Sequence, residues 1–137
     1  MVYNEIHAFL AKELGESYTY ELKREKWGFI VTIVRADKKG TASLYWYYDN
    51  ADKAYFAALS VSKEERLKGY GSALQTVCES LAKELGYKEI LLSVYLIEGQ
   101  ENTLVDMYKK RGYIEVSTER TRLEADIAYK VWLSKSL

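Results

Sequence analysis

Apolar residues recur at helical spacing in three stretches of the chain. In the first stretch they share one helical face: Ile6, Phe9, Leu10 and Leu14. Asn4 can cap this helix and Gly15 can end it. The same spacing indicates a second helix that ends at Gly86: Leu74, Val77, Cys78, Leu81 and Leu85. The third helix, "TLVDMYKKR", is short, and Gly112 closes it after a run of basic residues.

Seven other segments have the patterns of strands. "SYTYEL" alternates and places Tyr18, Tyr20 and Leu22 on one face. "WGFIVTIVRA" is apolar on both faces, as a central strand should be, and "DKKG" after it is a turn. The remaining predicted strands are "TASLYWYY", "KAYFAALSV", "EILLSVYL", "YIEVS" and "EADIAYKVWLS".

The predicted order is one helix, four strands, a helix, a strand, a helix and two strands. Short turns join the first four strands, which can therefore be antiparallel. The strand–helix–strand unit from about Tyr55 to Tyr95 should be a right-handed parallel crossover. These features predict an α/β (α+β) fold with a single mixed, mostly antiparallel sheet and flanking helices, in one domain over residues 1–137.

Composition excludes several classes of protein. The chain has 20 basic and 20 acidic residues, whereas nucleic-acid binders usually carry a basic excess, so we expect no nucleic acid partner. No apolar run is long enough to span a membrane, and the acidic, amphipathic start is unlike a signal peptide, so we expect a cytoplasmic protein with no membrane partner. A single cysteine, Cys78, and a single histidine, His7, predict neither a disulfide framework nor a metal centre.

The segment "EERLKGYGSAL" joins a predicted buried strand to the second helix. Glycine allows a close approach of the backbone to a ligand, and the first turn of a helix has unpaired N–H groups that favour an anion. Arg66 and Lys68 add positive charge beside Gly69 and Gly71. The segment can therefore hold a phosphate, or it can be a tight turn without a ligand. Leu74 stands where a dinucleotide-binding fold has a third glycine, and the G-K-[ST] of a nucleotide P-loop is absent.

Two stretches resemble a known family. "LSVSKEERLKGYGSAL" resembles the acyl-CoA-binding signature of the GNAT superfamily of N-acetyltransferases, with Val61, Arg66, Gly69 and Gly71 at the family spacing. "NTLVDMYKKRGYIEV" is similar to a second family segment, in which a helix carries a tyrosine before Gly-Phe or Gly-Tyr and a strand. The matching positions are Tyr108, Gly112 and Tyr113. Together the resemblance covers roughly residues 59–116.

The resemblance implies an acetyl-CoA cosubstrate and no metal. Two parallel strands, ending near Val61 and Val94, would splay apart and hold the pantetheine arm. Tyr108 would hydrogen-bond the sulfur and protonate the departing thiolate as a general acid, while the acceptor amine attacks directly. The residues implied to contact the coenzyme are Leu59, Val61, Arg66, Leu67, Lys68, Gly69, Tyr70, Gly71, Ser72 and Asn102.

The chain departs from the family pattern at several places. Asn102 lies six residues before Tyr108, where the family usually has seven, so Glu101 occupies the expected place. A single helix comes first, whereas family members usually begin with a strand and two helices. The general base is not identified by a motif, and the candidates that follow the splayed strand are Ser93, Tyr95 and Glu98.

Several residues have a structural interpretation beside the functional one. Tyr108 could be part of the core with Leu104 and Met107, and Cys78 and His7 are expected to be structural. In "YWYYDN", Tyr45 and Tyr47 share one strand face, and Trp46 and Tyr48 share the other. One face could be core and the other partly wet sheet surface, or one of the two could line an acceptor pocket. The basic segments "KKRGY" and "ERTR" are expected to be solvated, or to meet the phosphates of the coenzyme.

Three functions are consistent with these patterns. The first is an N-acetyltransferase that acts on a primary amine of a small molecule or a protein. The second is a non-catalytic GNAT-like interaction module that retains coenzyme A binding. The third is a nucleotide or nucleic-acid binder that uses Arg66 and Lys68, which the zero net charge disfavours. Exposed edge strands at both ends of the sheet make a homodimer a reasonable expectation.

Overall fold

The computed structural model describes residues 3–61, 70–98, 103–123 and 126–137. Three helices lie within these ranges: α1 (Tyr3–Leu14), α2 (Tyr70–Glu84) and α3 (Leu104–Lys110). The strands are β1 (Tyr18–Arg24), β2 (Gly28–Arg35), β3 (Gly40–Tyr47), β4 (Lys53–Val61), β5 (Glu89–Ile97), β6 (Ile114–Leu123) and β7 (Asp126–Ser136). The predicted order of helices and strands is confirmed.

All seven strands form one sheet in the order β1-β2-β3-β4-β5-β7-β6. The first four strands are antiparallel neighbours, as the short turns predicted. β4 and β5 are parallel, and α2 connects them. β5 pairs with β7 and β7 with β6, both antiparallel. The sheet is therefore mixed and mostly antiparallel, as the sequence predicted.

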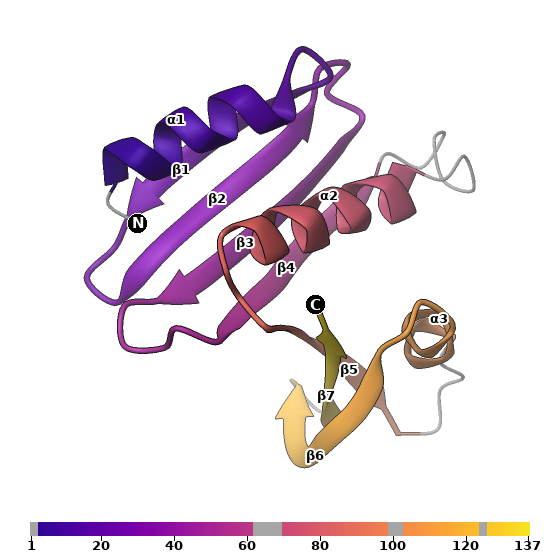
Figure 1. Cartoon of the computed structure of the whole chain (residues 1–137). Helices are drawn as coiled ribbons and strands as arrows, with labels where there is room; N and C mark the ends of the chain where they lie inside the picture. Colours follow the sequence, from indigo (N-terminus) through magenta and orange to yellow (C-terminus); the bar gives the residue numbers. More distant parts are fainter. Residues whose placement is uncertain (1–2, 62–69, 99–102, 124–125) are drawn as a thin grey trace.

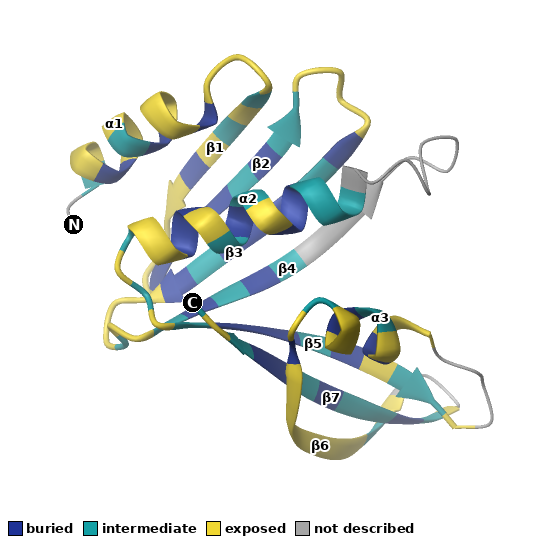
Figure 2. Ribbon diagram, turned by 45° about the vertical axis from the view of Figure 1, so that its right-hand side comes forward, coloured by how far each residue is buried: buried dark blue, intermediate teal, exposed yellow. Residues whose placement is uncertain are grey.

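The helices lie on one face of this sheet, and α1 and α2 cover its N-terminal half (Figure 1; Figure 2). The core lies between them and the sheet. α1 contributes Ile6, Leu10 and Leu14 to it, as its helical spacing predicted. The strands contribute alternate residues such as Val31 and Leu44, both fully buried. The opposite face of the first four strands is not covered by any helix of the described residues.

β4 and β5 pair over only three residues each, from Lys53↔Glu89 to Tyr55↔Leu91. Beyond this point the two strands separate, and the sheet divides into two halves (Figure 1). The pairing of β3 with β4 changes register at the same place, because Ser43 pairs with Ala57 but Thr41 pairs with Ser60. One residue of β3 therefore stands opposite two residues of β4, which is a β-bulge that bends and twists the strand. The bulge accounts physically for the divergence of β4 from β5.

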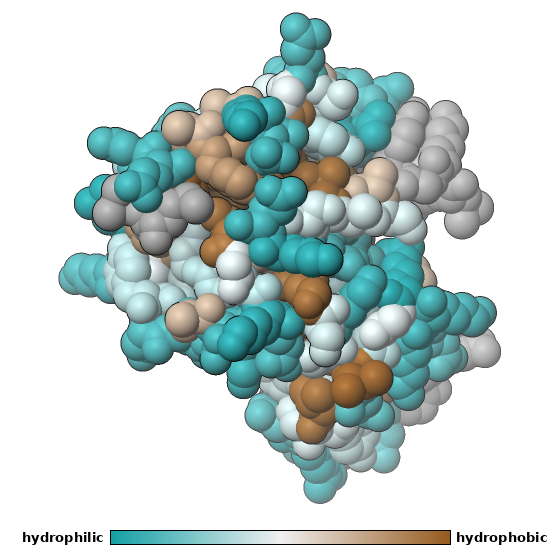
Figure 3. All heavy atoms as spheres, viewed as in Figure 1, coloured by the Kyte–Doolittle hydropathy of each residue, from teal (hydrophilic) through white to brown (hydrophobic). Residues whose placement is uncertain are grey.

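Two boundaries differ from the sequence prediction. Asn4 lies inside α1, which begins at Tyr3, so it is not the cap. β6 continues to Leu123 and includes "ERTR". The charged residues of this segment are exposed, as expected, but their backbone pairs with β7 and forms an edge of the sheet. Hydrophobic surface lies over β6, where Ile114 and Val116 are exposed (Figure 3).

Gly28 begins β2 where the strand lies very close to β3. A Cβ atom at this position would stand 1.9 Å from the carbonyl oxygen of Trp46, which is a backbone atom. Because a backbone atom cannot rotate away, Gly28→Ala should separate the β2–β3 ladder and lower the free energy of unfolding by about 3 kcal/mol. Urea denaturation followed by circular dichroism measures this change.

Gly15→Ala is the matched control. Gly15 has φ +59° after the end of α1, but a Cβ atom there would meet no atom within 4 Å. Its replacement should cost only the strain of the left-handed conformation, about 1 kcal/mol. Equal losses in the two variants would contradict the close contact at Gly28.

Candidate functional site

A cleft of about 290 Å³ lies where β4 and β5 separate. It is lined by two residues of β4, four of β5 and two of α3: Phe56, Ala57, Leu92, Ser93, Val94, Tyr95, Leu104 and Tyr108. The surface is indented between the start of α2 and α3, in the direction of this cleft (Figure 3). The gap between the two parallel strands is therefore a real cavity, and Tyr108 is part of its wall.

The sequence around Tyr108 fixes the end of α3. The N–H of Gly112 donates to the carbonyl of Lys109, and the N–H of Tyr113 donates to the carbonyl of Tyr108. Gly112 has φ +97°, the left-handed conformation that this kind of helix stop requires. The ring of Tyr113 then packs edge-on against that of Tyr108 at 5.8 Å. The segment "YKKRGY" therefore holds Tyr108 by both its backbone and its ring.

The environment of Tyr108 keeps its hydroxyl protonated. The residue is only 7% exposed, and burial raises its pKa, because the phenolate would lose its hydration. The guanidinium of Arg111, 5.9 Å from the ring centre, acts in the opposite direction and lowers the pKa. A neutral hydroxyl beside a cation can donate a proton to an anion that forms in the cleft.

The N-terminal end of α2 is the second part of the site. Tyr70, Gly71 and Ser72 form its first turn, which contains no acidic residue. The free N–H groups and the dipole of this 15-residue helix favour an anion at that end. Arg66, Leu67, Lys68 and Gly69 lie outside the described residues, as does Asn102. Their contacts with the coenzyme stay predictions.

Leu59 and Val61 lie on the last part of β4, where the backbone of Val61 pairs with Gly40 of β3. On the other side, the described pairs with β5 end at Tyr55. The edge of β4 that turns toward the cleft thus offers main-chain groups to an extended ligand, which would lie there like an extra strand. The implied roles of Leu59 and Val61 stay predictions.

The candidates for the general base separate into two groups. Ser93 and Tyr95 line the cleft, whereas Glu98 is exposed one residue beyond the end of β5. Among the described lining residues there is neither a carboxylate nor an imidazole. A proton of the attacking group would therefore leave through Ser93, Tyr95 or water.

Cys78 is confirmed as a packed residue of α2. Its thiol is fully buried, and burial raises its pKa to about 12. It also does not belong to the wall of the cleft. The native protein should therefore resist a thiol reagent such as 5,5′-dithiobis-(2-nitrobenzoate) at pH 8, and guanidinium should expose one reactive thiol. Rapid stoichiometric labelling without denaturant would contradict this placement.

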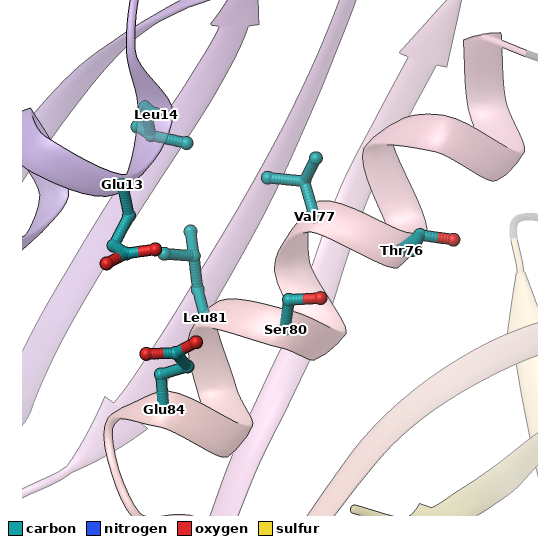
Figure 4. Close-up of a pocket in the computed structure, with 7 residues that line it drawn as sticks. All are labelled: Glu13, Leu14, Thr76, Val77, Ser80, Leu81 and Glu84. Carbon is teal, nitrogen blue, oxygen red and sulfur yellow. The ribbon is translucent and has the colours of Figure 1, made fainter.

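His7 and a pocket between α1 and α2 are remote from this chemistry. The hydroxyl of Tyr20 lies 2.6 Å from Nδ1 of His7, outside the residues that line the cleft. The pocket between the helices, of about 150 Å³, contains Glu13 from the end of α1 and Glu84 from the end of α2 (Figure 4). Neither Tyr108 nor any other described residue of the cleft lines it.

Sequence reasoning missed a set of contacts that connect the two halves of the sheet. Arg111, which follows α3, donates from Nη1 to Oε1 of Gln75 on α2. Lys135 of β7 donates to Oε2 of Glu79, also on α2, at 2.8 Å. Gln75 is 1% exposed, so these contacts are partly shielded from water. They join residues far apart in the chain, and no local pattern could have indicated them.

The described residues contain neither a membrane-spanning helix nor a cluster of metal ligands. None of their helices is long and apolar enough to cross a membrane. Within the same residues, histidine, cysteine, aspartate and glutamate do not form a group of three or more that could hold a metal ion.

Solved structures with this fold include several acetyltransferases. A GNAT family acetyltransferase from Elizabethkingia anophelis with acetyl-CoA bound is 12% identical, with a TM-score of 0.64 over 90% of this chain and 100% of its own. An aminoglycoside 6′-N-acetyltransferase complexed with coenzyme A is 17% identical, with a TM-score of 0.65 over 82% of this chain and 74% of its own. The ribosomal-protein-S18-alanine N-acetyltransferase from Escherichia coli is 16% identical, with a TM-score of 0.60 over 94% of this chain and 75% of its own.

A sequence comparison with curated proteins gives no match. The sequence profile of a family does match, over residues 2–113, and its description is "Acetyltransferase (GNAT) family". The matched range includes α1, the separating strands β4 and β5, and Tyr108. This chain is therefore a member of the GNAT acetyltransferase family.

Proposed function

We propose that this protein transfers the acetyl group of acetyl-CoA to a primary amine of a small molecule or a protein. The observation that carries the proposal is the position of Tyr108 in the wall of the cleft between β4 and β5. The pyrophosphate of the coenzyme binds at the N-terminal end of α2, near Gly71 and Ser72, and its pantetheine arm extends into the cleft.

The reaction is a direct transfer. The amine nitrogen attacks the thioester carbonyl carbon, the carbon–sulfur bond breaks, and the amine loses a proton to solvent, either directly or through the hydroxyl of Ser93 or Tyr95. Tyr108 donates its hydroxyl proton to the departing sulfur and regains one from solvent. No covalent enzyme intermediate is needed, in agreement with the burial of the only thiol, Cys78.

Acetyl-CoA-dependent turnover tests the proposal. The protein is mixed with acetyl-CoA and a panel of primary amines and peptides with free N-termini or lysines, and released coenzyme A thiol is measured. Mass spectrometry of the acceptor should show one added acetyl group. Acetyl-CoA binding without thiol release for any acceptor would contradict catalysis.

A non-catalytic module is the second candidate function. It is favoured by the lack of a carboxylate or imidazole among the described residues that line the cleft. Such a protein would bind coenzyme A and acetyl-CoA with similar affinity and would not consume either.

A further inference from the structure

One face of the sheet carries a group of aromatic side chains, which we call the aromatic face: Trp27, Tyr45, Tyr47, Tyr55 and Trp132. The aromatic face is the face of the sheet that the helices do not cover. Leu44 and Trp46 of β3 point into the core beneath the helices, so Tyr45 and Tyr47, which alternate with them, point to the other side. Trp27 is 41% exposed and Tyr47 is 37% exposed. A contiguous group of partly exposed aromatic side chains, unlike a single one, is typical of a surface that binds a ligand or partner.

The rings of the aromatic face contact one another edge to face or stacked. The ring centroids of Trp27 and Tyr45 are 5.7 Å apart, with their planes at 85°, and those of Tyr45 and Tyr47 are 5.9 Å apart at 86°. Tyr55 stacks on Tyr45 at 5.0 Å. Each ring therefore holds its neighbours in place, and the wall that they form is preorganised rather than loose.

Three of these rings, those of Trp27, Tyr45 and Tyr47, line an open pocket of about 310 Å³ together with Ile30, Ser43 and Ala57. Its volume is within the range of small-molecule sites. Ala57 also lines the cleft between β4 and β5, so the two cavities meet at this residue. A molecule in the pocket would thus lie next to the place where the thioester is proposed to bind.

The chemistry of the pocket is apolar and uncharged. Burial raises the pKa of Tyr45, so its hydroxyl stays neutral. The hydroxyl of Ser43 already pairs with that of Thr32 at 3.3 Å. Among the described lining residues there is no acidic group that could pair with additional ammonium groups. Charged groups lie around the pocket rather than in it: Lys23 of β1 stands opposite Ile30 and pairs with Glu21, and the ammonium of Lys130 lies 4.8 Å from the ring centre of Trp132.

We propose that this pocket binds an aromatic group of the acceptor, so that the substrates are primary amines with one amino group and an aromatic ring on a short linker. The proposal rests on the proposed function and names its substrate class. The ring lies against Trp27 and Tyr47, and the amine extends past Ala57 into the cleft. A polycationic acceptor is disfavoured, because the described residues that line the pocket include no carboxylate to pair with further ammonium groups.

A pair of matched amines tests the substrate class. The value of kcat/KM is measured for 2-phenylethylamine and for n-butylamine, with the native protein and with Trp27→Ala and Tyr47→Ala. The native protein should prefer 2-phenylethylamine, and each variant should lose about tenfold for this amine, the value of one aromatic contact. The kcat/KM for n-butylamine should not change. An equal loss for both amines, or no native preference, would overturn the proposal.

Two variants control for effects on folding. Trp27→Leu keeps an apolar side chain at the same place and should show most of the loss for 2-phenylethylamine without harm to the fold. Tyr48→Ala removes an aromatic residue, 53% exposed, whose ring contacts Phe29 rather than the aromatic face. It should leave the ratio between the two amines unchanged.

A binding measurement distinguishes failure of this inference from failure of the proposed function. Saturation-transfer NMR with 2-phenylethylamine needs no turnover, and its signal should fall in Trp27→Ala. A normal signal together with failure to bind acetyl-CoA would overturn the acetyltransferase function but keep the aromatic pocket. Acetyl transfer to aliphatic amines with no signal from 2-phenylethylamine would overturn the pocket and keep the function.

Discussion

Replacement of Tyr108 by phenylalanine should lower the rate of acetyl transfer by about 10²–10⁴-fold, the usual contribution of a general acid. The variant keeps the ring, which is buried against Tyr113 and near Arg111, so the fold and the cleft should be unchanged. Only the proton for the departing sulfur is lost. Steady-state kinetics with a saturating acceptor and calorimetric titration with acetyl-CoA should show a reduced kcat and a nearly constant coenzyme affinity.

Tyr113→Phe is the matched control for Tyr108→Phe. Tyr113 is also a buried tyrosine, 2% exposed, but it does not line the cleft. Among the described residues its buried hydroxyl has no hydrogen-bond partner, so its removal should not lower the stability or the transfer rate. A transfer rate in Tyr108→Phe as high as in Tyr113→Phe would remove Tyr108 from the mechanism.

The pH dependence follows from the raised pKa of Tyr108. Burial disfavours its phenolate, so the acid form persists to higher pH than in a free tyrosine, whose pKa is 10.0. The midpoint of any loss of kcat from deprotonation of Tyr108 should therefore lie above pH 10. A fall in kcat near neutral pH that disappears in Tyr108→Phe would contradict this assignment.

Gly71→Asp should weaken acetyl-CoA binding by at least about 100-fold. A carboxylate in the first turn of α2 would lie where the pyrophosphate is proposed to bind, and the juxtaposition of like charges costs several kcal/mol. The helix itself should not suffer, because aspartate is favourable in a first turn and glycine is a poor helix former. Calorimetric titration measures the affinity, and thermal unfolding verifies the fold.

Ser80→Asp is the control for the added charge. Ser80 is exposed on the same helix, nine residues after Gly71, which is about 13 Å along the axis. This separation exceeds the screening length at physiological salt, about 8 Å. Ser80→Asp should therefore bind acetyl-CoA like the native protein. An equal loss of affinity in both variants would mean that the charge acts on the whole molecule and not on a site at the start of α2.

The sequence predicted most of the fold because local patterns were strong. Period-two alternation identified the faces of β1 and β3, and period 3.6 identified α1 and α2. The end of β6 was missed because "TERTRL" is an exposed edge that pairs only with β7, and such a strand needs no hydrophobic face. The cap of α1 was missed because several residues near its start can take that position.

The site was predictable only in part. The residue types and the spacing around Tyr108 and Gly71 indicated it, since a helix stop and a helix start are local features. The contact between Arg111 and Gln75 joins residues 36 positions apart and depends on how α3 packs beside α2. The pocket beside Ala57 could not be predicted from the sequence either, because the apolar pattern of "WGFIVTIVRA" made Trp27 the first residue of a predicted strand. In the structure it precedes β2 and folds over Tyr45 and Tyr47.

The central claim is that the opening between β4 and β5, together with the start of α2, is a binding site for acetyl-CoA. Calorimetric titration of the native protein with acetyl-CoA tests it most directly. The account predicts one binding site per chain, with a Kd between about 1 μM and 1 mM, the range in which enzymes usually bind their substrates. Absence of binding with acetyl-CoA at several millimolar would contradict the claim and leave the cleft and the start of α2 without an assigned ligand.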